Sequence, residues 1–93
     1  MNKSRDAFLA LKQKFPEMPD VGSLTDEQKA WLHMKIQTIS DVVQQSPTAS
    51  YLQKIRNRLV HATEDVPDEE LQKIVSFVFK NMNEIQKLVE KQD

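Results

Sequence analysis

The chain has 93 residues, enough for one domain, and its 14 acidic and 13 basic residues give a formal net charge of −1. It has no cysteine and a single glycine, Gly22. These counts exclude disulfide bonds, thiolate metal sites, a cysteine nucleophile and any glycine-rich phosphate loop. The scarcity of glycine also argues against a sheet protein, which needs glycine at tight turns. We therefore expect one helical domain over residues 1–93.

Targeting and metal-binding signals are weak. No apolar run approaches the roughly 18 residues of a membrane span, and the first residues are amphipathic rather than continuously apolar. We therefore expect no membrane span and no secretory signal, and a cytoplasmic location is the default prediction. His33 and His61 are too few for a histidine-dominated zinc centre, so no metal or other cofactor is expected.

The first predicted helix runs from about Ser4 to Lys14, with Ser4 as its N-cap. Pro16 ends this helix, and Pro19 keeps the following segment irregular. The longest predicted loop therefore covers residues 15–24. Apolar residues recur along one side of the helix at helical spacing: Phe8, Leu11 and Phe15.

The second predicted helix begins at a capping box, in which Thr25 caps the helix and Gln28 reaches back to it. Asp26 and Glu27 place negative charge at the N-terminus, where the helix dipole favours it. The helix is expected to end near residues 44–45. Its predicted core stripe has steps of four and three residues: Leu32, Ile36, Ile39 and Val43.

Two further helices complete the predicted fold. Ser46 and Pro47 open the third, as N-cap and first helical residue. The pattern breaks over residues 61–66, and Pro67 starts a fourth helix that extends to about Lys91. A heptad-like seam lines the fourth helix: Leu71, Val75, Val78, Met82, Ile85 and Val89. Short connections favour antiparallel neighbours, so we predict a small antiparallel four-helix bundle with a short first helix.

Two phenylalanines of the fourth helix cannot both join this seam. Phe77 and Phe79 lie about 200° apart around the helix axis. Either at least one of them is exposed for a partner, or the surrounding helices bury both. Together with Met82 they are the predicted contact residues if the protein binds another protein.

The third helix carries the polar residues best suited to catalysis or RNA binding: Lys54, Arg56, Asn57, Arg58 and His61. An imidazole can transfer a proton near neutral pH, and a guanidinium can hold a phosphate and stabilise developing charge. Such a set could cleave RNA without a metal. On one regular helix Arg56 and His61 lie about 140° apart. They would converge if the helix ends before His61, or if a second subunit completes the site.

The spacing Arg56-Asn57-x-x-x-His61 resembles the R-N-x-x-x-H signature of HEPN domains, a family of small all-helical bundles. The resemblance covers residues 51–89. It implies a metal-independent ribonuclease, often the toxin of a toxin–antitoxin pair, with an active site built across a homodimer. The implied catalytic residues are Arg56, Asn57 and His61, and Lys54 and Arg58 would contact RNA. The implied partners are RNA, a cognate antitoxin and a second copy of the chain.

The alternative is a non-enzymatic binding protein. Small cysteine-free helical bundles with a charged second helix also resemble the immunity proteins that protect producers of class II bacteriocins. An adaptor that dimerises through the heptad-like seam is a third possibility. In a purely structural role, Arg56 and Arg58 would pair with Glu64 or Asp65, and His61 would support the helix C-terminus. The sequence leaves open whether the protein is an enzyme.

Overall fold

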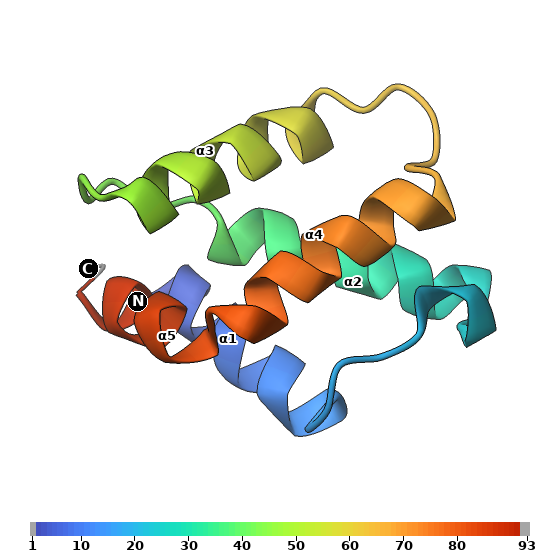
Figure 1. The fold of residues 1–93 in the computed structure, drawn as a ribbon, viewed down its shortest axis with the longest axis horizontal. Helices are drawn as coiled ribbons and strands as arrows, with labels where there is room; N and C mark the ends of the chain where they lie inside the picture. The colour runs from blue at the N-terminus through green and yellow to red at the C-terminus, as the bar shows by residue number, and fades with distance from the viewer. Residues whose placement is uncertain (1, 92–93) are drawn as a thin grey trace.

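The computed structural model describes residues 2–91, which form five α-helices, one short 3-10 helix and no strand (Figure 1). The all-helical fold class is confirmed. The predicted four-helix bundle is not confirmed, because the predicted last helix is divided at Asn81 into two helices. In chain order the elements are α1 (Lys3–Lys14), η1 (Val21–Ser23), α2 (Asp26–Ile39), α3 (Pro47–Val60), α4 (Asp68–Lys80) and α5 (Met82–Glu90).

Helix α2 holds the fold together. It packs against α1, α3 and α4, while α5 packs against α1 and α3 (Figure 1). The apolar face of α2 enters a single core cluster, and each fully buried large side chain contributes about 1.5–3 kcal/mol. The largest fully buried side chains are Phe8, Leu11, Leu32, Ile36, Ile39, Leu52, Leu59 and Ile85.

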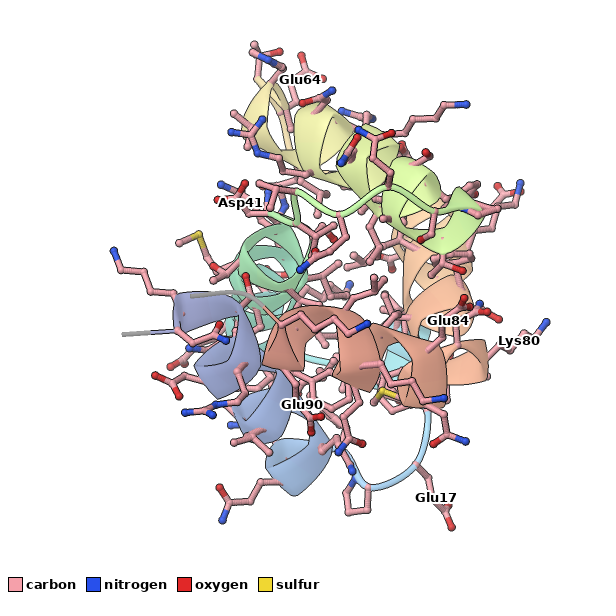
Figure 2. The ribbon with its side chains drawn as sticks, turned by 90° about the vertical axis from the view of Figure 1, so that its left-hand side faces the viewer. Glu17, Asp41, Glu64, Lys80, Glu84 and Glu90 are labelled. Carbon is pink, nitrogen blue, oxygen red and sulfur yellow. The ribbon has the colours of Figure 1, made fainter. Side chains whose placement is uncertain are left out.

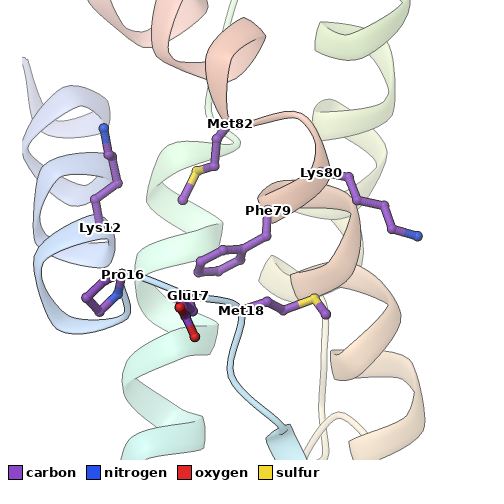
Figure 3. Close-up of a pocket in the computed structure, with 7 residues that line it drawn as sticks. All are labelled: Lys12, Pro16, Glu17, Met18, Phe79, Lys80 and Met82. Atoms are coloured by element: carbon purple, nitrogen blue, oxygen red, sulfur yellow. The ribbon is translucent and has the colours of Figure 1, made fainter.

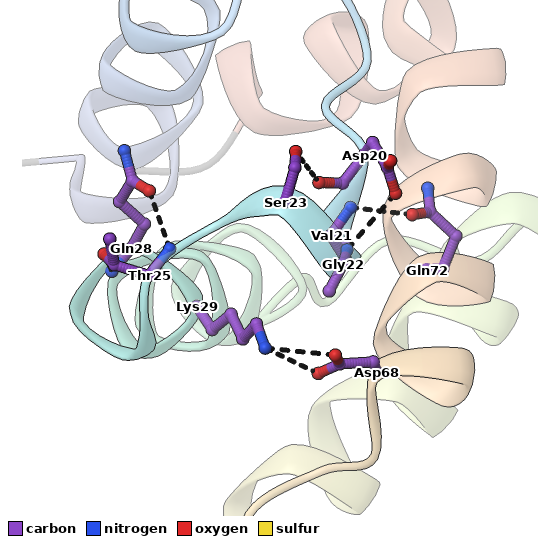
Figure 4. Close-up of polar contacts among 9 residues, drawn as sticks. All are labelled: Asp20, Val21, Gly22, Ser23, Thr25, Gln28, Lys29, Asp68 and Gln72. Atoms are coloured by element: carbon purple, nitrogen blue, oxygen red, sulfur yellow. Dashed lines mark hydrogen bonds and ion pairs between the residues drawn. The ribbon is translucent and has the colours of Figure 1, made fainter.

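Two predicted helix starts are confirmed. The Thr25 N–H donates to Gln28 Oε1 at 2.9 Å, and the Gln28 N–H donates to Thr25 Oγ1 at 3.1 Å (Figure 4). Ser46 caps α3, because its Oγ accepts a hydrogen bond from the Ala49 N–H at 3.0 Å. Pro47 occupies the first turn, where its missing N–H costs nothing. Both caps therefore fix where the predicted helices begin.

The predicted N-cap of the first helix is wrong. Asn2 caps α1, with its Oδ1 accepting from the Arg5 N–H at 2.9 Å. Ser4 lies inside the helix and is buried, and its hydroxyl donates to the Thr38 carbonyl at 3.0 Å. The serine therefore stabilises the last turn of α2 and not the first turn of its own helix. This long-range contact is invisible in the local sequence.

The second helix ends at Ile39, five residues before the first predicted end. Side chains of two other helices bind the carbonyl groups that follow, since Ser4 donates to the Asp41 carbonyl and Gln53 donates to the Val42 carbonyl at 3.0 Å. Val42 is buried here, whereas the predicted core residue Val43 is 75% exposed. The connection thus replaces further helical turns with hydrogen bonds to α1 and α3.

The break at Asn81 separates α4 from α5. Its Nδ2 donates to the Phe77 carbonyl at 2.8 Å, a local bond of the kind that competes with regular helix formation. The backbone at Asn81 leaves helical geometry, with φ −116° and ψ 25°. The predicted seam is therefore interrupted. Its members on both helices are buried apart from Met82, which is half-buried at the first position of α5.

The loop between α1 and α2 is fastened to α4 by one glutamine (Figure 4). Val21 is fully buried, and its N–H donates to Gln72 Oε1 at 2.8 Å. Gln72 Nε2 donates in turn to the Pro19 carbonyl at 3.3 Å. Nearby, Lys29 of α2 forms a 3.0 Å ion pair with Asp68 at the start of α4. These contacts hold residues 19–21 in place, whereas residues 16–18 are exposed.

Charged side chains cover the outside of the molecule. Figure 2 labels six of them, all exposed: Glu17, Asp41, Glu64, Lys80, Glu84 and Glu90. Within residues 2–91, no helix has both the length and the apolar character that crossing a membrane requires.

Gln72→Ala is expected to lower the free energy of unfolding by about 1–3 kcal/mol, because it leaves the buried Val21 N–H without its acceptor. Urea denaturation followed by circular dichroism measures this change. Gln45→Ala is the matched control, since Gln45 is exposed in the α2–α3 connection. Equal stability of the two variants would contradict the anchoring role of Gln72.

Candidate functional site

Arg56 lies on the inner flank of α3 and is half-exposed. Its Nε is 3.5 Å from Asp41 Oδ1 in the α2–α3 connection, and its Nη1 donates to Asn57 Oδ1 at 3.1 Å. It lines a shallow cleft of about 210 Å³ with residues of α1, α2 and α3: Lys3, Ser4, Gln37, Thr38, Asp41 and Val60. The guanidinium therefore already has a carboxylate and an amide as neighbours.

His61 is the C-cap of α3, directly after its last helical residue, and its side chain is exposed. The backbone there has φ −94° and ψ 8°, and the His61 N–H still donates to the Asn57 carbonyl at 3.1 Å. Asn57 and His61 share the outer face of α3 with the exposed Ser50 and Lys54, at helical spacing. Arg56 faces the α2 side. A single chain therefore does not direct Arg56 and His61 at one point.

Arg58 is held by Glu70 of α4 and not by the predicted Glu64 or Asp65. Its Nε and Nη2 donate to the two carboxylate oxygens of Glu70 at 2.7 and 2.8 Å, a two-point ion pair. The side-chain hydrogen bond from Arg58, reinforced by its positive charge, lowers the pKa of Glu70 below its ordinary value. The same contact raises the pKa of Arg58.

The predicted RNA contacts therefore differ in how available they are. Arg58 and Arg56 are each paired with a carboxylate, which offsets their attraction for phosphate. Lys54 is exposed and makes no ion pair within residues 2–91. The outer face of α3 thus offers one unpaired ammonium group and one imidazole beside an amide.

Phe77 is half-buried between α4 and α3. Its ring packs on that of Tyr51, with centroids 4.2 Å apart and planes tilted by 31°. Nearby, Thr48 at the start of α3 donates to Glu84 Oε2 at 2.6 Å, linking α3 to α5. Phe77, one of the predicted partner-binding residues, therefore packs α4 against α3.

Phe79 and Met82 lie together in a different place, an open groove of about 510 Å³ (Figure 3). We call it the Phe79 groove. The remaining walls come from the end of α1, the exposed part of the loop after it and the end of α4. Its lining residues are Lys12, Pro16, Glu17, Met18, Phe79, Lys80 and Met82. The break at Asn81 lies between Phe79 and Met82, so the groove follows the α4–α5 junction.

Sequence reasoning missed the contribution of the loop. Met18 is 48% exposed although it is a large apolar residue. It lies between Pro16 and Pro19, and prolines restrict the backbone of such a segment. An apolar side chain between two prolines in a polar loop is the signal that could have identified this wall of the groove.

The second histidine has a structural role. His33 of α2 is half-buried, and its Nε2 lies 3.2 Å from the Leu59 carbonyl in the last turn of α3. It borders a small cleft of about 130 Å³ together with Asp26, Asp65 and Asp68. Within the described part of the chain, no three histidine or acidic side chains are arranged to hold a metal ion.

The Arg58–Glu70 pair predicts a pH dependence. A depressed Glu70 pKa adds stability that is fully present above its ordinary value of 4.5 and is lost as the pH falls through the lowered one. Glu70→Gln is therefore expected to flatten the loss of stability below pH 4.5. Urea midpoints measured against pH test this. Glu64→Gln is the control, because Glu64 is exposed in the α3–α4 connection and has no ion pair within residues 2–91; it should leave the profile unchanged.

Comparison with known proteins adds no family. No family model, no curated protein and no solved structure matches the chain.

Proposed function

We propose that the protein is a non-enzymatic helical protein that binds another protein through the Phe79 groove. The observation that carries this proposal is the meeting of Met18, Phe79 and Met82 at one open groove. These side chains come from a loop, from α4 and from α5, so the surface exists only in the folded chain. A toxin neutralised by an immunity protein, or the target of an adaptor, fits this class of partner.

The chemistry of the groove suits protein binding. Grouped apolar side chains at a surface gain free energy when a partner covers them, and one well-buried apolar anchor contributes about 1.5–3 kcal/mol. Methionine side chains adapt to differently shaped partners. Phe79 and Met82 are half-buried against the core, which holds their positions before binding. Pre-positioned contact residues lower the entropy cost of association.

The polar residues of α3 give less support to catalysis within one chain. The Arg56 guanidinium lies beside Asp41 on the inner flank, and the exposed His61 lies on the outer face. RNA cleavage in which His61 transfers a proton and Arg56 holds the phosphate requires both groups within reach of the same substrate. The cytoplasmic location expected from the sequence remains part of the proposal for a binding protein.

Met18→Asp is expected to abolish binding through the groove, because it places a charge among apolar contacts. Short peptides selected from a random displayed library against the wild-type protein serve as probes. Met34→Asp is the matched control, since Met34 is 60% exposed on α2 and does not line the groove. Most selected peptides should lose binding to Met18→Asp and keep it to Met34→Asp. Peptides that bind both variants equally would refute the groove as the docking surface.

A second candidate function is a HEPN-like, metal-independent ribonuclease that acts as a homodimer, in the manner of a toxin from a toxin–antitoxin pair. It is favoured by the hydrogen bond between Arg56 and Asn57 and by the exposure of Asn57 and His61 on one face. A second copy facing α3 would have to bring its own Arg56 towards His61. In that arrangement His61 transfers protons and Arg56 holds the phosphate.

His61→Ala is expected to abolish RNA cleavage under this second candidate, in the presence of a metal chelator. Ser50→Ala is the control, because Ser50 is exposed on the same face and supplies no group for the reaction. Gel analysis of an RNA panel gives the cleavage rate, and sedimentation gives the oligomeric state. A monomer, or RNA left intact by the wild-type protein, would eliminate this candidate and leave the proposal for a binding protein standing.

A further inference from the structure

We infer that the segment occupying the Phe79 groove is an amphipathic helix of a partner protein with acidic side chains on both flanks of its apolar face. This inference rests on the proposed function and adds the chemistry of the partner. Three features of the groove support it: the charged side chains beside it, the helices that form its walls and the carboxylate of Glu17.

The groove has an apolar centre with a cation on each side (Figure 3). Phe79 and Met82 lie in the middle, Lys12 extends along the α1 side, and Lys80 points outward from the opposite side of α4. A helix lying on the apolar centre would therefore have Lys12 beside one polar flank, and the flexible Lys80 side chain would have to turn from the far side of α4 to reach the other flank. Carboxylates at those flanks match this arrangement.

Both cations are available. Neither Lys12 nor Lys80 forms an ion pair within residues 2–91, whereas Lys29, Arg56 and Arg58 each have a carboxylate partner. Lys12 Nζ lies 5.6 Å from the centre of the Phe8 ring, a contact with the ring face that leaves hydrogen-bond donors free for an incoming carboxylate. The positive charges beside the groove are thus not neutralised by carboxylates of the described residues.

The walls favour a helix over an extended segment. They are formed by the end of α1, the end of α4 and the start of α5, together with the loop at Met18. Residues 2–91 contain no strand whose edge an extended peptide could join. Packing an apolar helix face into a groove between helices is a recognition mode that such walls support, with anchors spaced by three or four residues.

Glu17 is the one carboxylate among the described residues that line the groove. It is exposed between Pro16 and Met18 and makes no ion pair within the described residues. Its negative charge repels an acidic partner at the loop end of the groove. Glu17→Lys should therefore strengthen binding of an acidic helix, by about twofold to fivefold for one exposed charge contact.

The test uses two designed helical peptides of about 14 residues, each about 21 Å long. Both carry the same leucine and phenylalanine anchors, and their flanking residues are glutamate in one and lysine in the other. Affinities are measured by fluorescence anisotropy at low and high ionic strength, and amide chemical shifts locate the bound peptide. The acidic peptide should bind about tenfold more tightly at low salt, with the difference shrinking as salt rises.

Charge-reversed variants link the preference to the groove. Lys12→Glu combined with Lys80→Glu should weaken the acidic peptide by about tenfold and strengthen the basic one. Lys54→Glu combined with Lys91→Glu changes the net charge equally at exposed lysines outside the groove, and should have little effect.

The outcomes distinguish the preference for an acidic helix from binding in the groove itself. Equal binding of both peptides, with shifts at Phe79 and Met82, would overturn the acidic preference and leave groove binding intact. Binding with shifts elsewhere, or no binding of either peptide, would overturn both the acidic helix and the groove as its site.

Discussion

The apolar face of α2 is the contact on which the rest of the molecule depends. Leu32, Ile36 and Ile39 are fully buried, and the helix that carries them touches α1, α3 and α4. A chain of this size buries a modest core, so few other contacts could replace this one. Each exposed feature considered for function is therefore supported from behind by α2, including the outer face of α3 and the walls of the Phe79 groove.

The two candidate surfaces differ in whether their charged side chains form ion pairs with other described residues. On α3 the arginines are matched by carboxylates from the α2–α3 connection and from α4, so that helix is stabilised against its neighbours. At the groove, lysines stand beside apolar side chains with no such matching, and the loop supplies an exposed methionine. The matched arginines support the packing of α3, and the unpaired lysines at the groove motivate the partner that we propose.

Local signals predicted the helices well, and long-range contacts account for most of the errors. The capping residues Thr25 and Ser46 act within four residues of themselves, and both were predictable. Ser4 carries an equally good capping side chain but bonds to the end of α2, which only the packed structure reveals. The early end of α2 likewise involves side-chain bonds from α1 and α3 to backbone carbonyls, whereas the break at Asn81 involves a local bond from its own side chain. The helical pattern singled out Phe79 and Met82, whereas their meeting with Met18 depends on the tertiary fold and could not be predicted.

The bond from Asn2 Nδ2 to the Val89 carbonyl, at 2.7 Å, brings the two ends of the described chain to one edge (Figure 1). Lys12, the α1 residue that lines the groove, lies ten positions after Asn2, which corresponds to a rise of about 15 Å along the helix axis. A short linker could therefore join residues 2 and 89 and permit a circular permutant opened in an exposed connection, such as that between α3 and α4. A fluorescent or immobilising tag joined to residue 2 or residue 89 would emerge from the same edge and leave the opposite end of α1 accessible.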